Sequence, residues 1–238
     1  TEGHGGTSST ARSNYRYNVG LDRSNPVVGT ANYQIEHRFV MTLGYEAEFF
    51  DGYATNFDVF FERRSGKPFS YVTNWDDFGD YDDPWSMLSP GFYAGNYLPY
   101  IPTAGDSNVI YTDNTSEAEV LARIEEAGLS SYAGGYGPKN EARTPWVNTL
   151  DLTIRQEIPG LMEGHKGSVY LTVDNLLNLI DSRRGKVYVN DFGTSRLYKA
   201  TIDPTTKKYV IDGVRNDSNT FDPQESTWRL KIGVSYKF

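Results

Sequence analysis

The last eleven residues of the chain alternate strictly between apolar and polar side chains. The apolar positions are Trp228, Leu230, Ile232, Val234, Tyr236 and Phe238, and the residues between them are charged or small and polar. Successive side chains of a β-strand point to opposite faces, so the pattern predicts a strand with one apolar and one polar face. A tilted strand crosses a bilayer with about 9–11 residues, and aromatic residues lie near both ends here. The segment is typical of a transmembrane strand of a β-barrel.

Four earlier segments alternate in the same way and predict four more strands. They cover residues 33–50, about 53–72, 145–158 and 169–178. Asp51-Gly52 predicts a two-residue hairpin turn, and residues 159–164 predict a second short turn. Phe60 has the parity of the polar residues around it, which indicates either a β-bulge or an aromatic side chain that fills a lumen.

Long segments without a strand pattern separate these strands at their other ends. Residues 1–32 are rich in Gly, Ser and Thr and predict a loop, and about 73–143 form a second, very long one. One short helix is expected inside it, capped by Thr115 or Ser116 and ended by Gly128. Residues 182–225 predict an irregular extension with a small hairpin around 203–206.

Short turns at one end and long loops at the other are typical of bacterial outer-membrane barrels. Strand directions alternate consistently if the C-terminus is periplasmic and the long loops are extracellular. We therefore expect an all-β fold, specifically an antiparallel transmembrane β-barrel segment of five strands.

Composition narrows the function classes. The net charge of −8 offers no basic surface for nucleic acid, and no apolar run is long enough for a transmembrane helix. The mean hydropathy of −0.57 suits a soluble protein, yet barrels with polar lumens and loops also give low values. The 14% aromatic content suits aromatic belts or a carbohydrate-binding sandwich, and the absence of Cys excludes disulfides and thiolate sites.

Several motifs occur in order along the chain: His37-Arg38-Phe39, residues 65–71, Tyr100-Ile101-Pro102, residues 143–159, residues 171–179 with Asn175-Leu176-Leu177-Asn178, and the ending 228–238. Together they resemble landmarks of TonB-dependent outer-membrane receptors of the Oar-like subgroup. The resemblance covers residues 33–238, interpreted as the C-terminal portion of the receptor barrel, with 1–32 as the remnant of an extracellular loop.

The resemblance implies a 22-stranded barrel in the outer membrane of a Gram-negative bacterium, with a plug and uptake of a scarce siderophore, oligosaccharide or peptide powered by the TonB complex. It also implies contacts with outer-membrane lipid, with the barrel-assembly machinery through the C-terminal strand, and with a surface lid or lipoprotein. Only the last five strands are expected here. Open strand edges are costly in lipid, so the remaining barrel and the plug must come from the same or a companion chain. The Gly/Ser-rich start is the kind of exposed loop in which a nick occurs.

The barrel interpretation assigns roles to three sets of residues. The charged residues expected to face the lumen or the plug are Glu36, Arg38, Glu46, Glu48, Asp58, Glu62, Asp151, Arg155 and Glu157. The aromatic loop residues Trp75, Tyr81, Trp85, Tyr93 and Tyr97 are candidates for contact with a substrate or partner, although a self-packed loop explains them equally well. The acidic residues Asp76, Asp77, Asp80, Asp82 and Asp83 are a weak candidate for Ca²⁺, because they lack the spacing of an EF-hand loop.

No constellation of catalytic residues accompanies these sets. The three histidines lack zinc-site spacing, and no nucleophile elbow or phosphate loop is present. We expect neither an enzyme nor a resident cofactor. Two alternatives to transport remain: an adhesion or assembly component built on the same barrel, and a secreted all-β carbohydrate-binding domain. The latter leaves the strand alternation and the terminal Phe238 unexplained.

Overall fold

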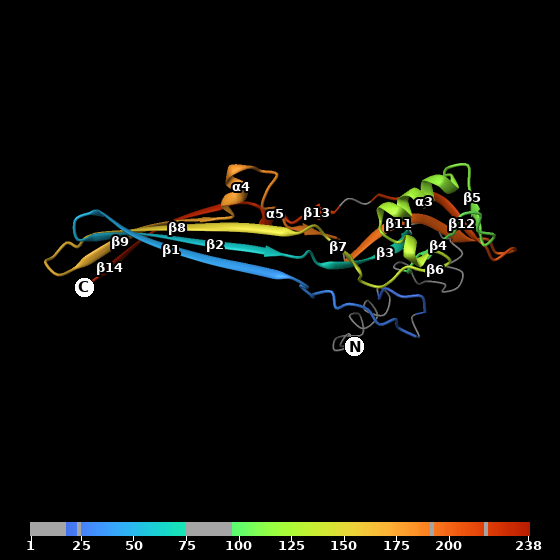
Figure 1. The fold of residues 1–238 in the computed structure, drawn as a ribbon, viewed down its shortest axis with the longest axis horizontal. Coiled ribbons are helices and arrows are strands. Elements are labelled where there is room, and N and C mark those ends of the chain that lie inside the picture. Colours follow the sequence, from blue (N-terminus) through green and yellow to red (C-terminus); the bar gives the residue numbers. More distant parts are fainter. Residues whose placement is uncertain (1–17, 23–24, 75–96, 191–192, 217–218) are drawn as a thin grey trace. The chain divides into compact units, whose positions relative to one another are not determined.

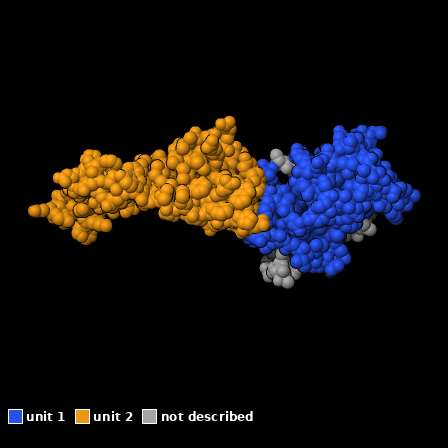
Figure 2. Space-filling view, viewed as in Figure 1, with its two compact units in different colours: residues 1–34, 68–143, 190–219 blue, residues 35–67, 144–189, 220–238 orange. Residues whose placement is uncertain are grey.

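The computed structural model describes residues 18–22, 25–74, 97–190, 193–216 and 219–238. The chain divides into two compact units, coloured separately in Figure 2. Unit 1 comprises residues 1–34, 68–143 and 190–219, and unit 2 comprises 35–67, 144–189 and 220–238. Most of the described secondary structure is β-sheet, and most of the strand pairs are antiparallel. The expected all-β character is confirmed at this level.

Unit 2 is built on a five-stranded antiparallel sheet with the order β1-β2-β8-β9-β14 (Figure 1). Its strands are β1 (Arg38–Phe50), β2 (Tyr53–Arg64), β8 (Val147–Pro159), β9 (Lys166–Asp174) and β14 (Arg229–Lys237). These are the five strands that alternation predicts. Within the described residues β1 and β14 each pair on one side only, so the sheet is open at both edges.

The predicted turns of this sheet are also present. Phe50 pairs with Tyr53 across Asp51-Gly52, where Gly52 has a φ of 77°, and Pro159 pairs with Lys166 across the second turn. A register shift lies between Ala47 and Phe50. Phe60 lies in unbroken register opposite Thr42 and Asp151, which excludes the bulge at that position.

Two predicted strands end earlier than expected. The strand predicted over 53–72 stops at Arg64 because Gly66 crosses the backbone of Thr144 so closely that a Cβ atom would lie 1.8 Å from its carbonyl oxygen. The Lys67 backbone N–H then donates to the Thr144 hydroxyl, the Thr144 backbone N–H donates to the Lys67 carbonyl, and the following residues enter another sheet.

The strand predicted through Asn178 ends at Asp174, since Asn175 adopts a left-handed conformation with a φ of 55°. The short helix α4 (Leu176–Ile180) follows instead of strand. The small pair β10 (Tyr188–Val189) with β13 (Thr220–Phe221) and the one-turn helix α5 (Pro223–Ser226) complete unit 2. No described helix is long and apolar enough to span a membrane.

Unit 1 contains a five-stranded mixed sheet with the order β5-β12-β11-β3-β7. Its strands are β3 (Pro68–Asn74), β5 (Val109–Tyr111), β7 (Ala142–Arg143), β11 (Thr194–Ile202) and β12 (Tyr209–Val214). A further pair joins β4 (Tyr100–Ile101) and β6 (Gly135–Tyr136). The helix α3 (Glu117–Glu126) and a 3₁₀ turn, η1 (Ser130–Tyr132), precede β6, and the core includes Ile101, Val120, Ile124, Leu197 and Ile211.

The predicted helix and hairpin of this unit are confirmed. Ser116 caps α3 in a reciprocal capping box with Glu119, and Gly128 follows its end with a φ of 72°. The hairpin between β11 and β12 turns at residues 203–208, where the Asp203 carboxylate accepts bonds from two backbone amides.

The expectation of a strandless loop over 73–143 is wrong for its described part. Residues 97–143 hold β4, β5, β6 and β7 besides the helix, and they pack with β3, β11 and β12 around a core of their own. Strands of two or three residues carry no readable alternation. The parallel pairs β3–β11 and β5–β12 also join segments far apart in the chain, which local pattern does not indicate.

Candidate functional site

The strand register of unit 2 aligns apolar side chains into continuous rows on one face of the sheet, called the apolar face below. Directly paired residues of an antiparallel sheet project on the same side. One row crosses all five strands as Leu43, Val59, Leu152, Val173 and Leu230, and the next as Tyr45, Phe57, Ile154, Leu171 and Ile232. The apolar residues of β14 therefore belong to a surface that extends over the whole sheet.

Much of this apolar face is open. Ile232 and Val234 on β14 are 70% and 72% exposed, and Leu43 on β1 is 56% exposed. Soluble monomers rarely expose contiguous apolar patches larger than a few hundred Å². The face accordingly fits an apolar environment better than water.

Aromatic side chains accompany the apolar face toward both ends. At the turn end, the Tyr236 hydroxyl lies 2.8 Å from Nδ1 of His165, and Phe49 packs edge-on against Phe57. At the opposite end, His37 stacks on Trp146 with ring centroids 6.1 Å apart. Rings with one polar edge are common at the two interfaces of a bilayer.

The opposite face, called the polar face, carries the charged residues that the sequence predicts for it. The register places seven of them there: Arg38, Glu46, Asp58, Glu62, Asp151, Arg155 and Glu157. Glu36 precedes β1 and donates its backbone N–H to the Ser65 hydroxyl, while Glu48 accepts a bond from the backbone of Gly52 at the hairpin. The location of the seven registered residues on one face agrees with the sequence analysis. That these residues line a lumen stays a prediction.

Cross-strand polar contacts link the strands of the polar face. Arg38 pairs with Glu62 at 2.5 Å, Lys231 with Asp174 at 2.6 Å, and Lys166 with Glu157 at 3.3 Å. Exposed pairs of this kind stabilise little individually, so they maintain register and polarity more than stability. The Tyr170 ring covers Gly233 on the neighbouring strand, where a Cβ atom would lie 2.2 Å from the ring.

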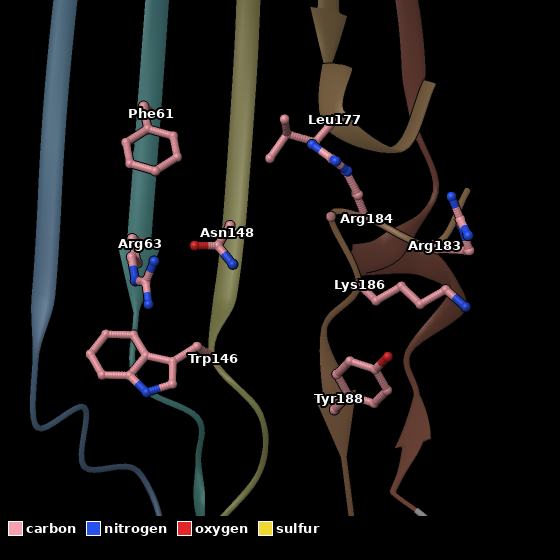
Figure 3. Close-up of a pocket in the computed structure, with 10 residues that line it drawn as sticks. Phe61, Arg63, Trp146, Asn148, Leu177, Arg183, Arg184, Lys186 and Tyr188 are labelled. Carbon is pink, nitrogen blue, oxygen red and sulfur yellow. The ribbon is translucent and has the colours of Figure 1, made fainter. Parts of the chain in front are cut away.

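A pocket of about 480 Å³ lies in unit 2, beyond the last apolar rows of β2 and β8 (Figure 3). Phe61, Arg63, Trp146 and Asn148 line it from β2 and the start of β8, and Leu177, Arg183, Arg184, Gly185, Lys186 and Tyr188 line it from the segment after β9. We call it the cationic pocket, because four of its ten lining residues are Arg or Lys.

The segment after β9 is held in place by Asn175. Its side-chain amide donates to the carbonyls of Gly185 and Ser226, both at 2.8 Å, and its backbone N–H donates to Asp151. Gly185 has a φ of 62° and lies so close that a Cβ atom would meet Asn175 Oδ1 at 2.1 Å. The Asn-Leu-Leu-Asn motif thus shapes one wall of the cationic pocket.

Two of the four cations in this pocket share one carboxylate. Arg183 bonds to Asp181 at 3.0 Å, and Arg184 lies 3.6 Å from the same carboxyl group. The hydrogen bonds from Arg183 hold the pKa of Asp181 down to about 2, so this carboxylate is ionised at neutral pH. Arg63 lies over the Trp146 ring at 5.0 Å and Lys186 over the Phe221 ring at 4.7 Å. The pocket therefore retains excess positive charge.

Unit 1 contributes a cluster of tyrosines. Tyr100 stacks on Tyr209 with centroids 4.9 Å apart and meets Tyr136 edge-on, and the hydroxyls of Tyr136 and Tyr209 lie 2.7 Å apart. Burial raises the pKa of Tyr209 above its ordinary value, and burial likewise raises that of Tyr111 to about 12. Tyr209 and Tyr111 therefore stay protonated to a higher pH than an ordinary tyrosine.

Several sequence candidates lie outside the described residues. These are the acidic residues Asp76, Asp77, Asp80, Asp82 and Asp83 and the aromatic residues Trp75, Tyr81, Trp85 and Tyr93. Tyr97 is described: it bridges Gly20, and its carbonyl accepts the Thr73 backbone N–H. Among the residues that the structure describes, no three His, Cys, Asp or Glu side chains are grouped for a metal ion.

Sequence reasoning missed the cationic pocket. Arg63, Arg183, Arg184 and Lys186 come from segments more than a hundred residues apart, and no motif unites them. The run Arg183-Arg184-Gly185-Lys186 was the available signal.

Comparison with known proteins finds no matching family model, no matching curated protein and no matching solved structure.

Proposed function

We propose that this chain supplies the C-terminal part of the wall of a TonB-dependent outer-membrane transporter. The apolar face of unit 2 contacts lipid, and the polar face lines the lumen or contacts the plug. The remaining strands and the plug come from the same or a companion polypeptide. The long loop over residues 73–143 is extracellular and contributes to capture of a scarce substrate.

The single observation that carries this proposal is the registered separation of the two faces. Two apolar rows cross all five strands on one face, whereas most side chains on the other face are charged or carry a hydroxyl group, with Val40 and Phe60 among the exceptions. A sheet that packs on a soluble core buries its apolar face, but here the edge strands leave Phe39, Leu43, Ile232 and Val234 more than half exposed. The order of the receptor-like motifs along the sequence supports the same proposal.

The two open edges of the sheet, β1 and β14, require further strands if the sheet lies in lipid. In lipid every backbone polar group needs a partner, and each unpaired one costs several kcal/mol. Half of the backbone groups of an edge strand point away from its neighbour. A lipid-embedded sheet therefore needs further strands beside β1 and beside β14.

Hydrogen–deuterium exchange on the detergent-solubilised assembly from native membranes tests this requirement. We expect the outward amides of β1 and β14 to exchange as slowly as those of the central strands β2, β8 and β9, because added strands bond them. The hairpin tip at 203–208 serves as the fast-exchanging reference. Fast exchange confined to every second amide of β1 and β14 would show free edges and contradict the barrel.

A further inference from the structure

The cationic pocket gathers more positive charge than its surroundings neutralise. Among the described residues, Arg183 and Arg184 form ion pairs, and both pair with the same carboxylate, Asp181. Arg63 and Lys186 lie against aromatic rings, with no carboxylate opposite either of them in the described structure. This excess is notable in a chain whose net charge is −8, and it favours an anionic ligand.

The donors of the pocket suit a phosphate group. Guanidinium groups present several N–H donors in a fixed plane and bind phosphate oxygens in pairs. Arg63 and Asn148 face the pocket from adjacent strands in direct register, and Arg184 reaches toward them from the segment after β9 (Figure 3). The side chains of Arg183 and Lys186 extend toward the other side of that segment, so they add positive charge at the rim. A phosphate between Arg63, Asn148 and Arg184 receives donors from both sides.

The pocket is continuous with the apolar face. Arg63 and Phe61 lie two residues apart on β2, on the same side of the sheet, and Phe61 pairs directly with Met41 and Leu150. Phe61 and Leu177 line the pocket as well. A ligand with an anionic head in the pocket can therefore lay apolar chains along the adjoining rows, which a free phosphate ion cannot use.

We propose that the cationic pocket binds the phosphate group of a membrane lipid whose acyl chains lie along the apolar face. This inference rests on the proposed function, since it requires that face to meet lipid. Arg63 and Arg184 bind the phosphate, Lys186 adds unneutralised charge at the rim, and Trp146 and Tyr188 border the headgroup at the end of the sheet. The site anchors the wall to the outer leaflet at the end of the sheet opposite the turns at 51–52 and 160–165.

Native mass spectrometry of the detergent-solubilised assembly tests this site with three probes. Dilauroyl phosphatidic acid carries an exposed phosphate, dilauroyl phosphatidylcholine carries the same chains with a choline over it, and inorganic phosphate has no chains. The test variant is R63Q/K186Q. The matched control K207Q/K208Q removes two lysines from the hairpin between β11 and β12.

We expect R63Q/K186Q to bind phosphatidic acid at least about tenfold more weakly than the unmodified protein, since the charge-assisted contact of Arg63 and the nearby charge of Lys186 are both lost. K207Q/K208Q should bind it unchanged. A second variant, R184Q, changes a side chain that is 69% exposed and should weaken binding without disturbing the fold. Circular dichroism of each variant checks the fold.

Three outcomes would overturn the inference. Equal affinity for phosphatidic acid and phosphatidylcholine would show that only acyl chains bind, and equal affinity for inorganic phosphate would show a site for the free ion. Unchanged binding by all the pocket variants would place the lipid elsewhere. Slow exchange at the sheet edges together with any of these results would retain the barrel and reject only the pocket, whereas fast edge exchange rejects the barrel whatever the lipid titration gives.

Discussion

Replacing Ile232 by Arg is expected to destabilise the assembled protein by about 2–4 kcal/mol, the cost of an arginine on the lipid face near the middle of a bilayer. Ile232 lies within β14, is 70% exposed, and belongs to a row that crosses all five strands of the sheet. Because the side chain is already open, the same change on a soluble surface costs little. The measurement is denaturant unfolding of the assembly reconstituted in lipid vesicles.

The matched control is Ser235→Arg, three residues along the same strand. Ser235 pairs with Ser168 on the polar face, in the row that also contains Glu157. An arginine there stays in a polar environment, so its effect should remain below about 1 kcal/mol. Equal effects of the two substitutions would argue against lipid on the apolar face.

The second large effect is expected at Asn175, which is 5% exposed. Asn175→Ala removes the bonds to the carbonyls of Gly185 and Ser226 and leaves both without that partner. It also places an alanine at a φ of 55°. With about 1–3 kcal/mol for each of the two buried carbonyls and about 1–2 kcal/mol for the left-handed backbone, we expect a loss of about 3–8 kcal/mol in the free energy of unfolding.

Two further variants separate these causes. Asn175→Gly removes the same bonds but accepts the left-handed backbone, so it should be about 1 kcal/mol less destabilising than the alanine variant. Asn178→Ala removes bonds to the carbonyls of Ser182 and Arg184, which are exposed and can be hydrated, and should cost under about 1 kcal/mol. A loss at Asn178 as large as that at Asn175 would contradict the anchoring role assigned to Asn175.

The elements that the sequence predicted are those whose signal is local. The strands of unit 2 are nine to thirteen residues long and separate an apolar from a polar face, so alternation alone locates them. The helix α3 has its cap, its acidic first turn and its glycine stop in one short stretch. The hairpin at 203–208 also has a local signal, because the Asp203 carboxylate accepts bonds from backbone amides two and three residues further on.

The parts that escaped prediction depend on contacts between distant segments. Gly66 ends β2 because of Thr144, and Asn175 ends β9 because of Gly185 and Ser226; neither partner is visible in the neighbouring sequence. The sheet of unit 1 joins strands of two to nine residues, and two of its four strand pairs are parallel. The cationic pocket likewise depends on how the segment after β9 folds back, so the sequence alone does not show that its lining residues lie together.

A nitroxide scan along β14 tests the central claim most directly. The chain contains no cysteine, so single cysteines at residues 229–237 can be labelled individually in the membrane-embedded assembly. We predict alternation with a period of two: labels at Leu230, Ile232, Val234 and Tyr236 are relaxed mainly by oxygen dissolved in lipid, and labels between them mainly by a water-soluble nickel complex. Equal access of the nickel complex to both sets would contradict the account, because it would place both faces of the sheet in water.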